Sequence, residues 1–190
     1  NGRTFRGSYM KKNQKSIGGI LYFEWLILII DYFKSIELKE RVFDVFVPLG
    51  IGIIISTTCM LCGKVEFATK GLADVLISLI SILIGFSVML VTLLLTSSGN
   101  GVDELKKRKS DIKIHNKEIS LFQKLHIQFA FSLISEILLL LIILVYYFLI
   151  TITNIGTLQV IFLFVFIFMI LNILLSIFRG IVNIYFAYYK

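Results

Sequence analysis

The most regular feature of this chain is a set of four long stretches that are almost entirely apolar. They span residues 42–62, 72–96, 127–151 and 157–181. Each has the roughly 20 residues that an α-helix needs to cross a bilayer. Hydrophobic residues make up 57% of the 190 positions, too many for a soluble domain to cover with polar surface. The pattern predicts an all-α polytopic membrane protein with four transmembrane helices.

A shorter apolar run, residues 17–33, precedes these stretches. It contains Glu24 and Asp31, which are seven residues apart and therefore lie on one side of a helix. Trp25, Tyr22 and Tyr32 are residue types that favour the depth of the lipid headgroups. The run therefore predicts an N-terminal amphipathic helix that lies in the membrane interface. The alternative is a fifth span.

The charge distribution favours four spans over five. Seven basic residues fall between the second and third stretches: Lys106, Lys107, Arg108, Lys109, Lys113, Lys117 and Lys124. Basic residues close to spans stay in the cytoplasm. With four spans, only Lys64 and Lys70 of the basic residues after Tyr9 face outward. A fifth span would export either the middle loop or the basic N-terminus, so we expect both termini and the loop to be cytoplasmic.

These runs divide the chain into five parts. We expect residues 1–9 to be a vector-derived remnant, 10–41 the basic N-terminus and interfacial helix, 42–96 the first transmembrane hairpin, 97–126 the cytoplasmic basic loop, and 127–190 the second transmembrane hairpin with the cytoplasmic C-terminus.

Small and polar side chains form one narrow stripe along the second stretch. Its members, spaced by three or four residues, are Asp74, Ser78, Ser81, Gly85, Val88, Thr92 and Thr96. Lipid tails are as apolar as leucine, so close approach between helices in a membrane favours small residues and interhelical hydrogen bonds. The stripe predicts a contact face, with three alternatives: packing within the chain, self-association, or the lining of a water-filled pore.

One carboxylate, Glu136, falls in the middle of the third stretch. A charge at that depth is unfavourable by several kcal/mol unless it faces the helix bundle or is protonated. Asn172 of the antiparallel fourth stretch lies at nearly the same depth, whereas Arg179 lies near the interface, where its side chain can reach the headgroups. We therefore predict a polar node of Glu136 and Asn172, which either responds to helix rearrangement or simply joins two helices.

The sequence offers little for catalysis or metal binding. Cys59 and Cys62 resemble a redox or zinc pair, but His115 and His126 belong to the loop on the opposite side of the membrane. Nucleotide-binding glycine motifs and zinc-protease motifs are missing from the sequence. We expect a protein that is not an enzyme and uses no cofactor.

The basic middle loop is the remaining candidate site. Its residues Lys106, Lys107, Arg108, Lys109 and Lys113 suit either contact with anionic lipids or docking of a cytosolic partner. The overall layout resembles the membrane subunit of the Kiwa anti-phage defence system: four spans, a basic start reading MKKNQKS, and a loop reading DELKKRKSDIKIHNKE. The resemblance implies a homo-oligomer of the bacterial inner membrane, such as a tetramer, that senses phage attack and works with a cytosolic DNA-binding effector subunit.

Two functions follow as hypotheses. The first is a non-enzymatic membrane sensor and scaffold that signals to this partner and contacts no nucleic acid itself. The second is a small homo-oligomeric channel or membrane-permeabilising effector, with the stripe lining the path.

Overall fold

The structure is a computed structural model that describes residues 24–36, 38–96, 105–114, 117–153 and 156–189. It contains the predicted four long helices: α3 (Leu38–Leu61), α4 (Val65–Thr96), α6 (Leu121–Ile152) and α7 (Gly156–Tyr189). All four are long and apolar enough to cross a membrane. The prediction of an all-α polytopic membrane protein is confirmed. The expected vector-derived remnant and residues 17–23 of the predicted interfacial helix lie outside the described residues.

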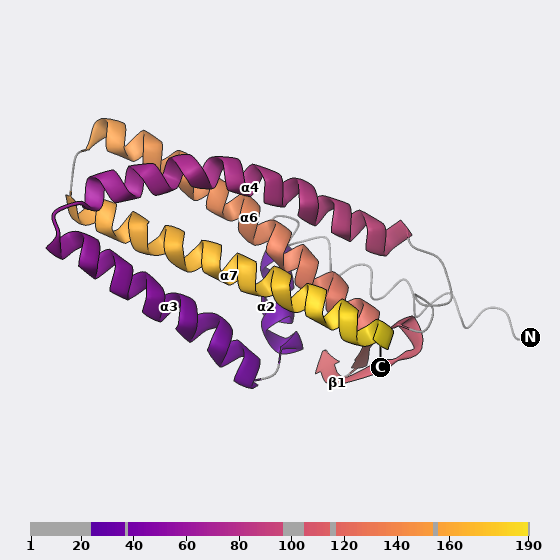
Figure 1. Cartoon of the computed structure of the whole chain (residues 1–190). Helices are drawn as coiled ribbons and strands as arrows, with labels where there is room; N and C mark the ends of the chain where they lie inside the picture. The colour runs from indigo at the N-terminus through magenta and orange to yellow at the C-terminus, as the bar shows by residue number, and fades with distance from the viewer. Residues whose placement is uncertain (1–23, 37, 97–104, 115–116, 154–155, 190) are drawn as a thin grey trace, which may run out of the picture.

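The four helices run antiparallel in sequence order, and α7 lies among the other three (Figure 1). It packs against α3, α4 and α6, whereas α3 has few contacts with α4. We call the end with the α3–α4 and α6–α7 connections the turn end. The opposite end, which carries the start of α3 and a short β-hairpin, is the hairpin end.

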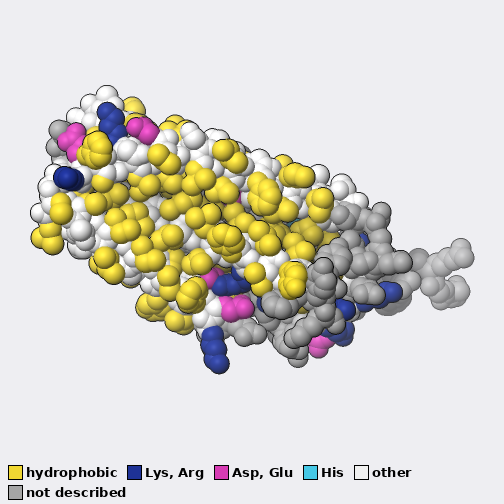
Figure 2. All heavy atoms as spheres, in the orientation of Figure 1, with side chains coloured by type: hydrophobic (Ala, Val, Ile, Leu, Met, Phe, Trp, Pro, Cys, Tyr) yellow, Lys and Arg dark blue, Asp and Glu magenta, His cyan; other side chains and the backbone are white. Residues whose placement is uncertain are grey.

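Most of the outer surface of the bundle is apolar, as expected for contact with lipid. In Figure 2 hydrophobic side chains cover the middle of the visible face, and charged side chains lie toward its margins. Exposed large side chains include Ile54, Ile82 and Phe148, at 65%, 71% and 67% exposure. The described chain is thus a multi-pass membrane protein in its length, composition and surface.

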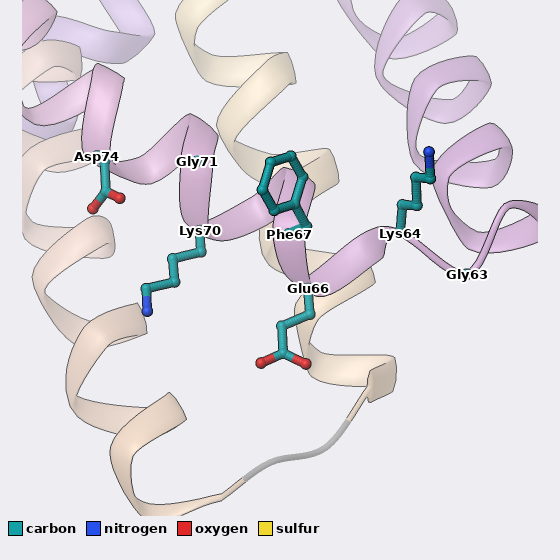
Figure 3. Close-up of a pocket in the computed structure, with 7 residues that line it drawn as sticks. All are labelled: Gly63, Lys64, Glu66, Phe67, Lys70, Gly71 and Asp74. Atoms are coloured by element: carbon teal, nitrogen blue, oxygen red, sulfur yellow. The ribbon is translucent and has the colours of Figure 1, made fainter.

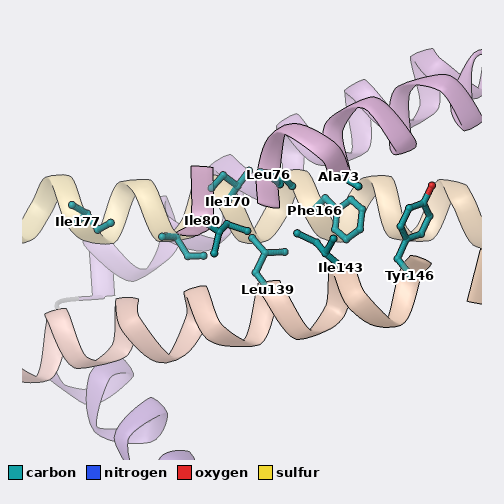
Figure 4. Packing of buried hydrophobic residues seen from close by; sticks show 10 residues of the cluster. Ala73, Leu76, Ile80, Leu139, Ile143, Tyr146, Phe166, Ile170 and Ile177 are labelled. Carbon is teal, nitrogen blue, oxygen red and sulfur yellow. The ribbon is translucent and has the colours of Figure 1, made fainter. Parts of the chain in front are cut away.

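The core lies where α4, α6 and α7 meet (Figure 4). Ala73, Leu76, Leu139, Ile143 and Phe166 are essentially inaccessible there. At the hairpin end of the same interface, Gly180 of α7 packs so tightly against α6 that a Cβ would lie 2.6 Å from Cζ of Phe129. Only glycine fits this position without a shift of the buried ring.

A glycine also ends α3. Gly63 has a φ of 65°, the left-handed conformation that glycine adopts without strain. The amide of Lys64 donates to the carbonyl of Cys59 and that of Gly63 to Met60, both at 3.1 Å. This is the usual glycine-terminated helix end, and it turns the chain directly into α4.

Helix α2 (Glu24–Ser35) crosses beside the bundle, and its 12 residues are too few to span a bilayer. It packs against α6 through Tyr32, whose ring stacks on Phe131 with centroids 3.6 Å apart. Arg41 of α3 donates to the carbonyls of Phe33 and Ile36, where a cation stabilises the exposed carbonyls at a helix end.

The sequence did not predict the β-hairpin of β1 (Lys109–Ile114) and β2 (Lys117–Ser120). It leads directly into α6, which Ser120 caps. The side chain of Ser120 accepts from the amide of Gln123 at 3.2 Å, and Gln123 Oε1 accepts from the amide of Ser120 at 2.9 Å. The spacing Ser-x-x-Gln is the capping-box signature and was readable in the sequence.

Candidate functional site

Among the described residues, four buried or half-buried polar side chains form a cluster that we call the Asp44 node: Tyr32, Asp44, Asn172 and Arg179. Asp44 of α3 and Arg179 of α7 form an ion pair whose side chains are 3% and 14% exposed. Tyr32 of α2 donates to Asp44 Oδ2 at 3.5 Å, a long and weak hydrogen bond. Three helices therefore meet at one carboxylate near the hairpin end.

Proline explains the position of Asn172 in this node. In an α-helix the carbonyl of Asp44 accepts from the amide of residue 48, but residue 48 is proline and has no N–H. Asn172 Nδ2 donates to this carbonyl instead, at 3.1 Å. A free carbonyl in a membrane needs such a partner. This hydrogen bond thus joins α3 to α7 at the point where proline interrupts the backbone hydrogen bonds of α3.

Burial makes the hydroxyl of Tyr32, which lies outside the membrane-spanning helices, a weaker acid. Its side chain is 1% exposed, and this burial raises the pKa of its hydroxyl to about 12, against a smaller lowering by a hydrogen bond with Ser176. Tyr32 is therefore a neutral hydroxyl at physiological pH and can donate to Asp44.

A second polar group, next to the node, joins α6 to α7. Asn183 Nδ2 donates to Gln128 Oε1 at 3.2 Å, and Gln128 Nε2 donates to the carbonyl of Ser176 at 2.8 Å. Ser132 Oγ lies 3.1 Å from Ser176 Oγ. Gln128, Ser132 and Ser176 are all buried, so these hydrogen bonds are made away from lipid.

The structure gives Glu136 a different partner from the predicted one. Its Oε1 accepts from Ser87 Oγ of α4 at 2.7 Å, and its side chain is completely buried. Its other oxygen has no hydrogen-bond partner in the part of the chain that the structure describes. The predicted pairing of Glu136 with Asn172 is therefore wrong, because Asn172 faces α3. The prediction that Arg179 reaches the headgroups is also wrong, because Arg179 pairs with Asp44.

The stripe on α4 points away from the bundle. Asp74, Ser78, Ser81, Gly85 and Thr92 are all exposed, and a Cβ on Gly85 would meet nothing within 4 Å. The face of α4 that packs within the chain carries Ala73, Leu76, Ile80 and Ser87 instead. Packing within the chain, one of the three alternatives for the stripe, thus holds only for Asp74, which contacts Tyr147 of α6, and not for Ser78, Ser81, Gly85 and Thr92.

Several polar members of the stripe have hydrogen-bond partners within the chain. Ser81 Oγ and Thr92 Oγ1 donate to the carbonyls four residues earlier, at 2.7 and 2.8 Å, and Asp74 accepts from the hydroxyl of Tyr147. A second helix can therefore approach Ser81 and Thr92 closely without leaving their hydroxyls unbonded.

The basic loop is partly described. Nζ of Lys106 lies 5.3 Å from the centroid of the Phe122 ring. Nζ of Lys109 forms an ion pair with Oε2 of Glu118 at 2.8 Å. This hydrogen bond raises the pKa of Lys109. Lys107 is exposed and Arg108 half-buried, whereas the side chain of Lys113 lies outside the described residues. Two residues of the predicted docking surface thus have contacts within the chain: Lys106 with α6 and Lys109 with β2.

Most of the Asp44 node was missed by the sequence reasoning. The readable signal was a pair of opposite charges, Asp44 and Arg179, inside two predicted spans at the same end of the bundle. A second signal was the four-residue separation of Asp44 and Pro48. Comparisons with family models, curated proteins and solved structures found no match to this chain.

Proposed function

We propose that this chain is a non-enzymatic sensor and scaffold of the bacterial inner membrane that signals to a cytosolic DNA-binding partner, as its resemblance to the Kiwa membrane subunit implies. One observation carries the sensing part. Helix α2 exposes Trp25, Leu26, Ile27 and Ile30, at 38–51% exposure, while its buried residue Tyr32 bonds Asp44. A helix with one face suited to the membrane interface is thereby attached to the polar centre of the bundle.

The signal would pass through the contacts that join α2 to the Asp44 node. A disturbance that displaces α2 would withdraw Tyr32 from Phe131 and from Asp44. The Asp44–Arg179 pair and the Asn172 bond would then lose one support, so α3 and α7 could change their relative position. Since α7 packs on α6, and α6 begins directly after the β-hairpin, the change would reach the basic loop.

The proposed output surface is the basic loop. The loop and both termini then lie in the cytosol. There an acidic surface of the partner would contact the five basic residues of the loop: Lys106, Lys107, Arg108, Lys109 and Lys113. The partner then makes the nucleic-acid contacts, and this chain makes none.

Self-association would use the stripe. Its members face outward and leave room for a second backbone, which is the geometry of small-residue contacts between membrane helices. A homo-oligomer such as a tetramer would place several basic loops side by side and raise the local concentration of bound partner.

The experiment is phage plating on bacteria that carry this chain together with its neighbouring genes. We expect deletion of the chain to abolish protection. Replacing Lys106, Lys107, Arg108 and Lys109 by glutamine should abolish it too, with the protein still present in the membrane. The control replaces Lys34 and Lys39, also exposed and predicted to be cytoplasmic, and should keep protection. Full protection after deletion, or after the loop replacements, contradicts the proposal.

The channel or membrane-permeabilising effector is a second candidate because the stripe faces outward. In an oligomer its serine and threonine side chains could line a shared path. Ion flux through vesicles containing the purified chain would support this function if Gly85→Leu blocks it. Gly50→Leu on α3 is the matched control, because a Cβ at Gly50 also meets nothing within 4 Å. Equal flux with and without the protein contradicts a channel.

A further inference from the structure

A groove of about 530 Å³ lies at the turn end, along the first three turns of α4 (Figure 3). Four of its lining residues are charged: Lys64, Glu66, Lys70 and Asp74. The last three are four residues apart, and Figure 3 shows their side chains on the same side of α4. Lys64 and Phe67 point to the other side. On the side of α4 that carries Glu66, Lys70 and Asp74, the groove therefore presents a row in which one cation lies between two carboxylates.

The members of this row are not equally available. Asp74 accepts a hydrogen bond from Tyr147 of α6. Glu66 and Lys70 are spaced for an intrahelical ion pair, yet both are exposed and make no ion pair with each other in the described structure. One carboxylate and one ammonium thus remain open to a ligand that carries both charges.

The depth of the row suits the headgroup region. From Val75 to Thr96, α4 has no charged residue. These residues are roughly 33 Å long at 1.5 Å per residue, close to the hydrocarbon thickness of about 30 Å. Lys70 then lies about one turn outside the hydrocarbon, and Glu66 one turn further out.

We propose that this groove binds a phospholipid headgroup that carries a phosphate and a primary ammonium, namely phosphoethanolamine. From the acyl chains outward, such a lipid presents first the phosphate and then the ammonium. Outward along α4, Lys70 comes first and Glu66 second, so each charge meets its opposite. Gly71 leaves open space beside Lys70, since a Cβ there would meet nothing within 4 Å.

The same charges discriminate between lipids. A choline headgroup has no N–H to donate to the Glu66 carboxylate, so it loses a charge-assisted hydrogen bond. An anionic headgroup without an ammonium satisfies Lys70 but gives the Glu66 carboxylate no cation to bind. The acyl chains can lie on the exposed residues Val75 and Ile82 further along α4. The inference is independent of the proposed function.

The experiment is native mass spectrometry of the purified full chain, titrated with phosphatidylethanolamine, phosphatidylcholine or phosphatidylglycerol of identical acyl chains. We expect phosphatidylethanolamine to bind about tenfold more tightly than either, the effect of one charged hydrogen bond. The double exchange of Glu66→Lys with Lys70→Glu keeps the net charge but reverses the order of charges, and should remove the preference.

The matched control exchanges the charges of two exposed residues at the hairpin end, Lys39→Glu with Glu118→Lys, and should keep the preference. Far-UV circular dichroism confirms that each variant is folded. Equal binding of the three lipids overturns the proposal, and so does a preference that survives the exchange at Glu66 and Lys70. A preference lost equally in the control exchange overturns it as well, because the effect would then not belong to this groove.

Discussion

Around α7, the half of the bundle toward the turn end is packed mainly by apolar side chains, whereas the half toward the hairpin end holds the Asp44 node and the polar group beside it. The first half is represented by Leu139, Ile143 and Phe166, the second by the Asp44–Arg179 pair. In lipid, apolar contacts between helices gain only packing energy, because the tails are equally apolar. A hydrogen-bonded pair is satisfied in one register only.

The two halves differ in how strongly they determine the relative positions of the helices. Apolar contacts at the turn end specify a register less strongly, because they gain only packing energy. At the hairpin end, a shift of one turn would leave Arg179 without its carboxylate and the Asp44 carbonyl without Asn172. The half with the polar contacts therefore sets the register and is the half in which a signal could change it.

The largest effect should come from breaking the ion pair. Asp44→Ala leaves the Arg179 guanidinium buried without its partner, which typically lowers the free energy of unfolding by about 3–5 kcal/mol. Reversible unfolding by SDS in mixed micelles measures it. The double variant Asp44→Leu with Arg179→Leu should recover most of the loss, because no uncompensated charge remains. Exposed ion pairs contribute less than about 1 kcal/mol. If Asp44→Ala lowers the free energy of unfolding by no more than that, the pair is solvated.

A smaller effect is expected from the apolar half. Ile143→Ala creates a cavity at a fully buried site, but the unfolded helices remain in an apolar environment, so only packing is lost. We expect a decrease of about 2 kcal/mol in the free energy of unfolding, the low end of the soluble-protein range. Ile161→Ala, on an exposed face of α7, is the control and should change little. An equal loss at both sites would contradict the assigned core.

The four spans were predictable because long apolar runs have one interpretation in a membrane protein. The ends of the helices were less so. Helix α4 begins at Val65, seven residues before the predicted start, because Glu66 and Lys70 belong to helical turns beyond the hydrocarbon. The β-hairpin was missed because its two strands are short and mostly polar.

The candidate site was predicted only in part, for a geometric reason. Position along a span gives the depth of a side chain, and by depth Asn172 was a reasonable partner for Glu136. Depth does not give the direction in which a side chain points. Because α7 lies among three helices, Asn172 faces α3 while Glu136 faces Ser87 of α4, and this arrangement follows from packing of the whole chain.

The link between Pro48 and Asn172 offers a sharper test of the polar half. Asn172→Leu leaves the Asp44 carbonyl without a donor and should lower the free energy of unfolding by about 1–1.5 kcal/mol. In a Pro48→Ala background, the amide of residue 48 can donate to that carbonyl, so the same change at Asn172 should have less effect. A double-mutant cycle measures the difference. Equal losses in both backgrounds would show that Asn172 does not compensate for the proline.

The smallest effect is expected at Ser87, where the two halves meet. Ser87→Ala removes the only donor to Glu136 within the described structure, and single hydrogen bonds between membrane helices average about 0.6 kcal/mol. The matched control is Ser78→Ala on the outward face of α4, which should leave the unfolding of the single chain unchanged.

Glu136→Gln keeps an acceptor oxygen for Ser87 at the same volume. If Glu136 is a neutral carboxyl that only joins two helices, this variant should match the wild type in stability, assembly and phage protection. A loss of protection with stability and assembly intact would instead make Glu136 part of the sensing rearrangement, and would extend the responsive region from the Asp44 node to the centre of the membrane.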